Sequence, residues 1–491
     1  MGLNILIAAS ECVPFAKTGG LADVVGILPK FLKQMGHDVR IVMPRYYKID
    51  KTKLKPVEVA MPLGVPMGVI GEQWCGVYEG SLPNSDVPVY FIDHEVYYGR
   101  DAIYNNESGE GFLDNDNRFV FLSRASLQLA KALGFKPDIV HANDWHTAAT
   151  PVFLNTAYKD DPFFEGCASV LTIHNMQYQG QFYNGLMDVL GIGWEHFTYL
   201  ELEQDDCVNL LKGGIYHSNL INTVSEGYKN EIMTAEYGYG LDGVMRDRAP
   251  FFRGILNGMD YDDWNPSIDK YLAKTYDIDD MGGKELCKSD IQSVMGLPVN
   301  PAIPLFGVVS RLVDQKGVVQ LSAAFEWIMG LDVQFVMLGE GDAWAHDFFR
   351  SMAAKYPQKF AVRIGYDNAL AHKIEAGADF FVMPSNFEPC GLNQMYSLRY
   401  GTPPIVRATG GLDDTIVNFD EKHKSGDGFK FFDATPAALY NTIGWATYTY
   451  YNDKEGLFAL RKNGMSKRYT WDESAKKYED MYMDAIKLKR G

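Results

Sequence analysis

Short apolar runs alternate with amphipathic stretches along most of this chain. Each run ends in a polar or glycine-bearing loop, and a helical pattern follows it. This alternation is typical of βα units around a parallel sheet. The strands that we expect in the first half lie at 4–10, 39–43, 87–93, 138–141, 169–174, 220–224 and 254–256.

A second series of the same kind follows. Its expected strands lie at 304–310, 333–338, 360–364, 380–383, 404–406 and 429–432. The stretch between the two series, from 260 to about 301, is rich in Asp, Pro and Gly and is the expected boundary. At 491 residues the chain is too long for one ordinary core, because domains usually hold about 100–200 residues. The sequence therefore predicts two large α/β domains.

The last part of the chain is an amphipathic helical pattern with an acidic first turn. We expect this helix, 471–491, to cross back and join the first domain. The predicted domains are then 1–258 with that helix, and 259–470.

Composition narrows the class of protein. Lys and Arg total 46 against 63 Asp and Glu, a net charge of −17, which argues against a nucleic-acid surface. The six cysteines form no CxxC pair, which indicates a reduced compartment. The first apolar run lacks a basic flank, so it is expected to be a buried strand and not a signal peptide. No uncharged apolar stretch reaches the roughly 18 residues of a membrane helix, so we expect no membrane partner.

Two basic, glycine-bordered loops carry the first chemical signal. Lys17-Thr-Gly-Gly20 follows the first expected strand, and Arg311 with Lys316 follows the strand at 304–310. Tandem glycines let backbone amides approach a phosphate, and a lysine adds a mobile charge. Taken alone, the first loop could be a tight turn and the second a solvated rim. Together they predict two cationic loops that face each other across a cleft and hold one diphosphate without a metal, as in a sugar-nucleotide transferase.

Glu388 is the third element of the predicted site. It stands at a strand end and is followed by Pro, Cys390, Gly391 and Leu392 before a helical run. A carboxylate there could hold sugar hydroxyls while the neighbouring amides hold the leaving group. The alternative is that Glu388 only caps the helix.

Three polar groups in the first half have structural alternatives. His174 ends an expected strand and would point at the cleft, although such a histidine is usually structural. His141 and His146 are five positions apart, which does not suit zinc, and a sugar-binding edge with Trp145 as a stacking plate is more natural. The triplet Asp114-Asn-Asp116 looks like a metal-binding motif of another transferase fold, but its Gly/Asn-rich setting predicts a flexible, solvated loop.

Together these motifs resemble the bacterial glycogen synthase and plant starch synthase family, from residue 4 to about 486. The combination is highly specific. The matching stretches are Lys-Thr-Gly-Gly-Leu-Ala-Asp-Val at 17–24, His-Ala-Asn-Asp-Trp-His at 141–146, Thr-Ile-His-Asn at 172–175, Ile-Leu-Asn-Gly at 255–258, Ser-Arg-Leu at 310–312, Gln-Lys-Gly at 315–317, Phe-Glu-Pro-Cys-Gly-Leu at 387–392 and Thr-Gly-Gly-Leu at 409–412.

The resemblance implies the GT-B architecture, two Rossmann-like doubly wound domains that face each other across a cleft. It implies transfer of glucose from ADP-glucose or UDP-glucose to the non-reducing end of an α-1,4-glucan, with retained configuration and no metal or other cofactor. The catalytic residues carried over are Lys17, His174, Arg311, Lys316 and Glu388. The donor contacts are Gly20, Asn257, Tyr366, Cys390, Gly391, Leu392 and Thr409. The acceptor contacts are Glu11, Asp23, Asp144 and Trp145.

One position departs from the broader pattern of retaining GT-B enzymes. Tyr396 stands eight positions after Glu388, where a second Glu is common, so the ribose contact made by that acid is in doubt here. The alternatives are a sugar-nucleotide epimerase, a sucrose- or trehalose-type transferase, and a silent glucan-binding scaffold. The expected compartment is the cytoplasm of a bacterium, or the plastid if the source is a plant or alga.

Overall fold

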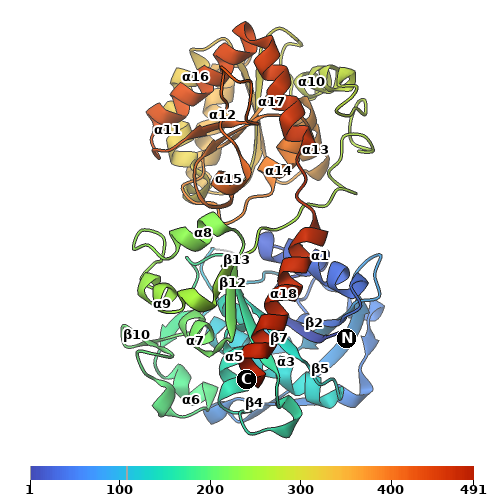
Figure 1. Ribbon diagram of the computed structural model, residues 1–491, viewed down its shortest axis with the longest axis vertical. Coiled ribbons are helices and arrows are strands. Elements are labelled where there is room, and N and C mark those ends of the chain that lie inside the picture. Colours follow the sequence, from blue (N-terminus) through green and yellow to red (C-terminus); the bar gives the residue numbers. More distant parts are fainter. Residues whose placement is uncertain (1, 107–108) are drawn as a thin grey trace. The chain divides into compact units, whose positions relative to one another are not determined.

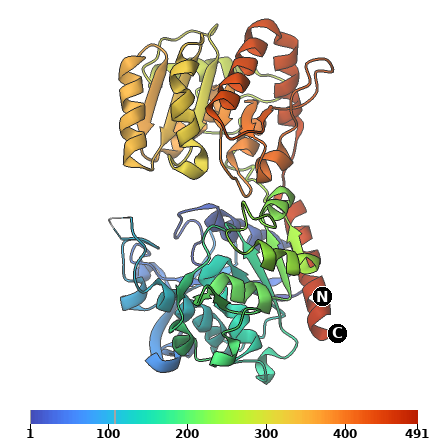
Figure 2. The same ribbon diagram turned by 90° about the vertical axis from the view of Figure 1, so that its left-hand side faces the viewer.

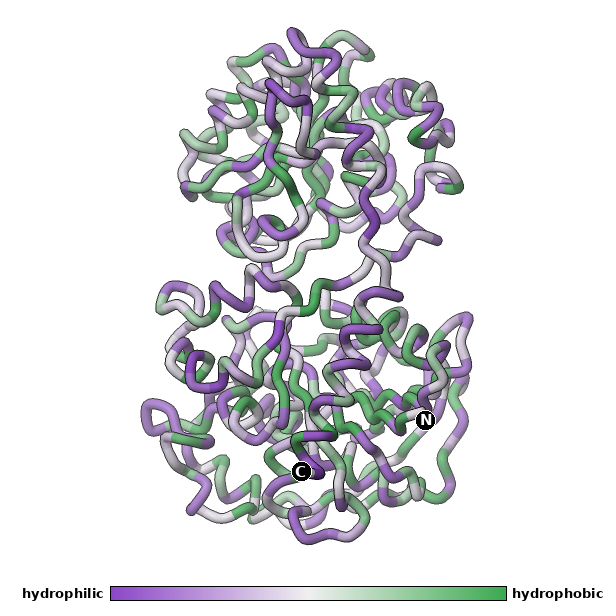
Figure 3. Tube along the Cα trace, in the orientation of Figure 1, coloured by the Kyte–Doolittle hydropathy of each residue, from purple (hydrophilic) through white to green (hydrophobic). Residues whose placement is uncertain are grey.

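The computed structural model describes residues 2–106 and 109–491. Its internal contacts divide the chain into two compact units. The first comprises the chain up to Val224, Lys229–Leu256 and Trp471–Gly491, and the second comprises Ser225–Tyr228 and Asn257–Thr470. The stretch at 260–301 lies within the second unit and contains the helix α10 (Gly282–Val294). In each unit, hydrophobic segments run through the interior and hydrophilic segments gather in the loops (Figure 3).

The first unit is built on one large sheet whose centre is parallel. In sheet order, the parallel strands are β13 (Phe252–Gly254), β12 (Leu220–Thr223), β8 (Ala168–Ile173), β7 (Ile139–Asn143), β1 (Asn4–Ala8), β2 (Asp38–Pro44) and β6 (Pro88–Asp93). The middle strands are buried on both faces, which is why they read as continuous apolar runs. The last expected strand of this series lies two residues earlier than predicted.

Antiparallel strands extend this sheet beyond β6, and the sequence pattern did not predict them. They are β5 (Glu72–Ser81), β3 (Lys55–Pro56) and β4 (Leu63–Pro66). A separate small sheet joins β10 (Glu203–Gln204), β11 (Cys207–Asn209) and β9 (Gln181–Tyr183). These strands are mostly short or half exposed, so they carry no continuous apolar run.

Helices cover the first sheet. The longer ones are α1 (Gly20–Gln34), α3 (Asn115–Ala132), α5 (Ala149–Asn155), α7 (Leu210–His217) and α18 (Trp471–Arg490). Shorter ones are α2 (Glu95–Tyr98), α4 (Asp144–Thr147), α6 (Leu186–Leu190), α8 (Glu226–Glu231) and α9 (Asp242–Asp247), of which α8 begins in the second unit. Helix α1 runs without interruption through Pro29. The Asp114-Asn-Asp116 triplet is not a solvated loop, because Asp114 precedes the first residue of α3 and Arg100 binds its carboxylate through both Nη atoms.

The C-terminal helix α18 packs against α1 and β8 of the first unit (Figure 1). Trp471, Tyr478 and Tyr482 are buried on its inner face. His141 of β7 bonds the Tyr482 hydroxyl through Nδ1 at 2.8 Å and the Thr172 hydroxyl through Nε2 at 2.6 Å. Both ring nitrogens of this buried histidine are therefore satisfied, and one of the two bonds anchors the helix.

The second unit holds a wholly parallel sheet between two helical layers (Figure 2). In sheet order its strands are β16 (Phe360–Ile364), β15 (Gln334–Gly339), β14 (Leu305–Val309), β17 (Phe380–Met383), β18 (Pro404–Arg407) and β19 (Phe429–Phe431). One face packs on α11 (Val318–Met329), α12 (Ala343–Lys355), α16 (Pro436–Asn452) and α17 (Lys454–Ser466). The other packs on α10 and α13 (Asn368–Gly377). Two short helices, α14 (Asn393–Arg399) and α15 (Gly410–Thr415), follow β17 and β18.

Strand order reverses once in each sheet, beside the first strand of each series. β1 lies between β2 and β7, and β14 lies between β15 and β17. In open α/β sheets, ligands bind outside the carboxyl ends of the strands at this switch point. The loops that leave β1, β7, β14 and β17 are therefore the places to look for a site.

We expect Tyr482→Phe to lower the free energy of unfolding by about 1–3 kcal/mol, because it leaves Nδ1 of His141 buried without its partner. Urea unfolding would measure the change. Tyr448→Phe, on an α16 side chain that is 59% exposed, is the matched control and should change stability by less than about 0.5 kcal/mol. Equal stabilities of the two variants would contradict the anchoring role of the His141 contact.

Candidate functional site

The second unit has a pocket of about 200 Å³ at its switch point, between the carboxyl ends of β14 and β17. Arg311 and Lys316 line it from the loop after β14, and Glu388 lines it from the loop after β17. The Lys316 ammonium lies 2.6 Å from Oε2 of Glu388, and the Ser385 hydroxyl donates to the same oxygen at 3.1 Å. Glu388 is only 5% exposed. A paired carboxylate and a flexible cation thus share one concave surface.

Gly317 explains why Lys316 reaches this position. Its φ is +72°, and a Cβ there would lie 1.9 Å from the carbonyl oxygen of Pro384. Only glycine allows the loop after β14 to pass this close to the loop after β17. Arg311 stays exposed, and its Nη2 donates to Gln315 at 3.0 Å.

The other predicted donor contacts divide into two groups. Gly391 and Leu392 line the pocket with Arg311, Lys316 and Glu388. Four more do not belong to its lining, namely Asn257, Tyr366, Cys390 and Thr409.

These four residues have different surroundings. Asn257 and Cys390 are both buried, and burial raises the pKa of the Cys390 thiol. Thr409 is buried just before α15. Tyr366 is 84% exposed beyond the end of the edge strand β16. Their donor contacts stay predictions.

Sequence reasoning missed three polar residues of this pocket, Ser310, Ser385 and Asn393. Ser385 bonds Glu388, and the Asn393 amide donates to the Val309 carbonyl at 2.8 Å, which ties α14 to the end of β14. All three lie within a few positions of a motif residue. The available signal was their place near element ends: Ser310 directly follows β14, Ser385 lies two positions after β17, and Asn393 is the first residue of α14.

Tyr396 fills the position of the missing acid with an aromatic contact. Its ring lies 4.1 Å from that of Trp264 with nearly parallel planes, and Trp264 stacks on His372 at 3.8 Å from its other side. The side chain is thus part of a stacked cluster in the second unit.

In the first unit, Glu11 holds the Lys17–Gly20 loop after β1. Its carboxylate accepts hydrogen bonds from the Thr18 hydroxyl at 2.6 Å, the Gly19 amide at 3.2 Å and the Thr18 amide. The Tyr104 hydroxyl, which sequence reasoning missed, donates to it at 2.5 Å. Glu11 is only 3% exposed, and its hydrogen bonds hold the backbone of the loop in place. Its contact with an acceptor stays a prediction.

Lys17 projects from this fixed loop toward solvent. Its ammonium pairs with Asp23 of α1 at 2.7 Å, and 52% of its side chain is exposed. Burial raises the pKa of Asp23, and the charge of Lys17 opposes that rise. Gly20 begins α1 beside this pair, and no atom would contact a Cβ built on it within 4 Å. The loop therefore presents a mobile cation on a rigid base.

Asp144 and His174 meet at the carboxyl ends of β7 and β8. Asp144 adopts a φ of +52°, and its Oδ1 accepts the His174 amide at 2.6 Å. Nε2 of His174 lies 2.9 Å from Oδ1 of Asn143. Burial lowers the pKa of His174 to about 3, so the ring is neutral at pH 7. Burial also raises the pKa of Asp144 to about 7.

Trp145 is not the exposed stacking plate that the sequence suggested. Only 8% of it is accessible, and its ring packs against Phe119 and Phe182. A Cβ on Gly180 would lie 2.4 Å from it, so backbone covers part of the ring. His146 is likewise buried and stacks on Tyr104. Trp145 and His146 therefore pack in the core next to Asp144.

We expect Asp144→Asn to flatten the dependence of stability on pH. The native pKa of about 7 exceeds the unfolded value of about 3.9, so wild-type stability falls as pH rises from about 4 to 7. Asn keeps the acceptor oxygen and tolerates the positive φ. Relative to this variant, the wild type should lose on the order of 2 kcal/mol between pH 5 and pH 7 in urea unfolding. Parallel profiles would show that Asp144 does not titrate in this range.

Comparisons with known proteins agree with this geometry. The family model described as "Starch synthase catalytic domain" matches residues 4–247, and "Glycosyl transferases group 1" matches 297–446. The chain is 60% identical to glycogen synthase 1 of Geobacter metallireducens, over 100% of this chain and 97% of that protein. The catalytic domain of starch synthase IV from Arabidopsis thaliana, solved with ADP and acarbose, superposes with a TM-score of 0.88 at 32% identity, covering 99% of this chain and 100% of that chain.

A sucrose-phosphate synthase from Thermosynechococcus elongatus shares the fold, with a TM-score of 0.60 at 16% identity over 98% of each chain. That likeness shows architecture alone. The full-length identity to the glycogen synthase is the stronger finding, and it excludes an epimerase and a silent scaffold as descriptions of the family. The fold is GT-B, and this chain belongs to the glycogen and starch synthase family of glycosyltransferases.

Proposed function

We propose that this protein transfers glucose from ADP-glucose to the non-reducing end of an α-1,4-glucan, with retention of configuration. The pairing of Lys316 with Glu388 beside Arg311 carries the proposal, because it brings two cations and a buried carboxylate together in one pocket. The glycogen synthase relative supports a glucan acceptor, and the ADP in the Arabidopsis structure supports an adenine nucleotide.

The charges suit departure of a nucleoside diphosphate. Breaking the anomeric bond makes the sugar oxocarbenium-like and adds negative charge to the diphosphate. Arg311 and Lys316 then stabilise the transition state more than the ground state. When the diphosphate binds, Lys316 exchanges the Glu388 carboxylate for phosphate oxygens, and Glu388 accepts hydrogen bonds from the glucose hydroxyls.

The proposal gives Lys17 a share of the diphosphate and places His174 at the reacting centre. A neutral imidazole can accept or donate one hydrogen bond there without adding a charge. Three cations from two loops neutralise the leaving group, so the transfer is proposed to need no metal. Glu388, held by Ser385 after Lys316 has moved to the diphosphate, acts as a positioned acceptor, and the glucan hydroxyl attacks the face that the diphosphate leaves. Trapping of a glucosyl ester on Glu388 would contradict this route.

None of the helices in the described ranges is long and apolar enough to cross a bilayer. The curated relative named above is bacterial. Of the two compartments considered from sequence, we therefore propose the bacterial cytoplasm.

We expect the purified chain to release ADP and lengthen the glucan when it is given ADP-glucose and glycogen, with EDTA present throughout. Release of nucleoside diphosphate and growth of labelled chains would be scored together. UDP-glucose in a parallel reaction measures donor preference. ADP release without chain growth would indicate another acceptor. Activity that appears without EDTA but is lost when EDTA is present would refute the metal-free mechanism.

We expect Lys316→Ala and Arg311→Ala to lower kcat by on the order of 10²-fold or more, because each removes a cation that acts on the leaving group. Lys355→Ala is the matched control, since Lys355 forms an exposed pair with Glu326 in the same unit. Its activity should equal that of the wild type. Near-normal turnover in folded Lys316 and Arg311 variants would reject their role.

A further inference from the structure

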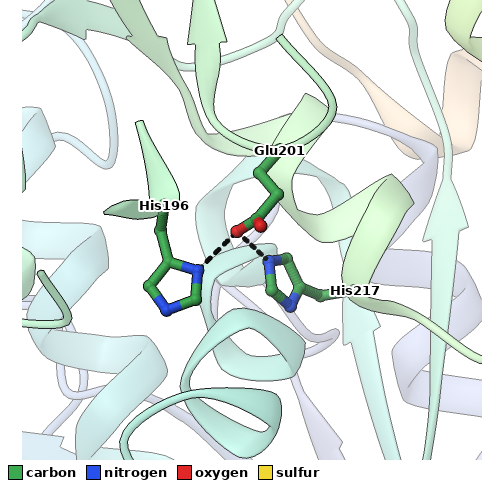
Figure 4. A group of neighbouring side chains, drawn as sticks. All are labelled: His196, Glu201 and His217. Carbon is green, nitrogen blue, oxygen red and sulfur yellow. Dashed lines mark hydrogen bonds and ion pairs between the residues drawn. The ribbon is translucent and has the colours of Figure 1, made fainter. Parts of the chain in front are cut away.

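Two histidines of the first unit, His196 and His217, contact the same carboxylate oxygen of Glu201 (Figure 4). Nδ1 of His196 lies 2.6 Å from Oε2 of Glu201, and Nε2 of His217 lies 3.1 Å from the same atom. The three candidate ligand atoms all lie within 4.8 Å of one another. This is the one such group of at least three His, Cys, Asp or Glu side chains among the described residues.

The three side chains come from separate pieces of local structure. His196 ends the 3₁₀ turn η5 (Trp194–His196), Glu201 lies in the turn before β10, and His217 is the last residue of α7. The Asn155 amide fixes that helix end by donating to the His217 carbonyl at 2.5 Å. The side chains are 24%, 28% and 11% exposed, respectively, so an ion can reach them from solvent.

The spacing is close to that of a metal centre. Ligand atoms about 2.0–2.1 Å from a tetrahedral Zn²⁺ stand roughly 3.3 Å apart. The His217 contact at 3.1 Å nearly matches this spacing, and the His196 contact at 2.6 Å needs to open by a side-chain rotation. In the metal-free state each imidazole donates one N–H to the carboxylate. To bind an ion through the same nitrogen, each neutral ring would carry its proton on its other nitrogen.

We propose that His196, Glu201 and His217 bind one Zn²⁺ ion, with water in the fourth position. Two imidazoles and a carboxylate favour zinc over Mg²⁺ and Ca²⁺, which prefer all-oxygen sites.

The role of this ion would be structural. It links the 194–201 segment to the end of α7, and the strands β10 and β11 of the small sheet lie between them in the sequence. Because the ion binds only the folded arrangement, it stabilises that arrangement in proportion to its concentration. The inference does not rest on the proposed transferase activity, and metal-independent transfer is compatible with it.

The test uses the full-length chain, stripped with chelator and then dialysed against Zn²⁺ or Co²⁺. We expect one Zn²⁺ per chain and the visible absorption of tetrahedral Co²⁺. Glu201→Gln, which preserves shape, and His196→Gln should each weaken Zn²⁺ binding by about tenfold or more and abolish the Co²⁺ bands. Far-UV circular dichroism confirms that each variant is folded.

His423→Gln is the matched control. His423 pairs with Asp420 at 2.7 Å, but that pair belongs to no group of three ligands in the described chain. This variant should keep the full stoichiometry and the Co²⁺ spectrum of the wild type. Equal binding by the wild type and folded Glu201→Gln, or no stoichiometric Zn²⁺ on the wild type, would overturn the proposal. If Glu201→Gln and His196→Gln lose Zn²⁺ binding but still release ADP from ADP-glucose, the metal site is independent of the proposed transferase activity.

Discussion

The carboxyl edge of each parallel sheet is the constraint on which the site depends. Parallel strands deliver all their following loops to one edge, and a reversal of strand order opens a crevice between two of those loops. In the second unit β14 and β17 leave such a crevice, and Arg311, Lys316 and Glu388 all follow from it. Burial of the strands on both faces keeps this edge rigid, so the position of the loops is fixed before any ligand binds.

Buried carboxylates then hold the loop backbone and the lysine side chains in position. Glu11 binds two backbone amides of the Lys17 loop, and Glu388 holds the Lys316 ammonium. Each acid thereby orders the cationic loop of its own unit. Lys17 and Lys316 each already pair with a carboxylate. An anionic ligand must therefore interact with the ammonium more favourably than the carboxylate that it displaces.

The fold could be read from sequence where apolar runs were continuous. The strands at 360–364 and 380–383 were predicted to the residue. β17 is buried almost throughout and is apolar throughout, as expected of a central parallel strand. β16 is a half-exposed edge strand, and Arg363 interrupts its apolar run. The strands β3, β4 and β5 were missed, since β3 and β4 are short and contain proline, while β5 is partly exposed and contains glycine.

The site was predicted unevenly for a similar reason. Motifs marked Lys316 and Glu388, but no local pattern shows that they touch across 72 positions. Trp145 was misjudged because the rings that cover it come from distant segments, including Phe119 and Phe182. Tyr104 was missed as a partner of Glu11 because 93 positions separate them. Sequence identifies residue types at strand ends, whereas burial and partnership depend on packing between elements.

The two lysine pairs differ in a way that bears on the proposed donor. Lys17 and Asp23 are partly exposed, and such pairs contribute only about 0–1 kcal/mol, so a diphosphate can displace Asp23 readily. Glu388 is almost fully buried, and removing Lys316 from it leaves an acid held by Ser385 alone. ADP satisfies the lysine but not the glutamate. A nucleotide sugar satisfies both at once, because its hydroxyls take the place of the ammonium. Under the proposed function, the buried pair would favour donor over product because of the cost of an unpaired buried charge.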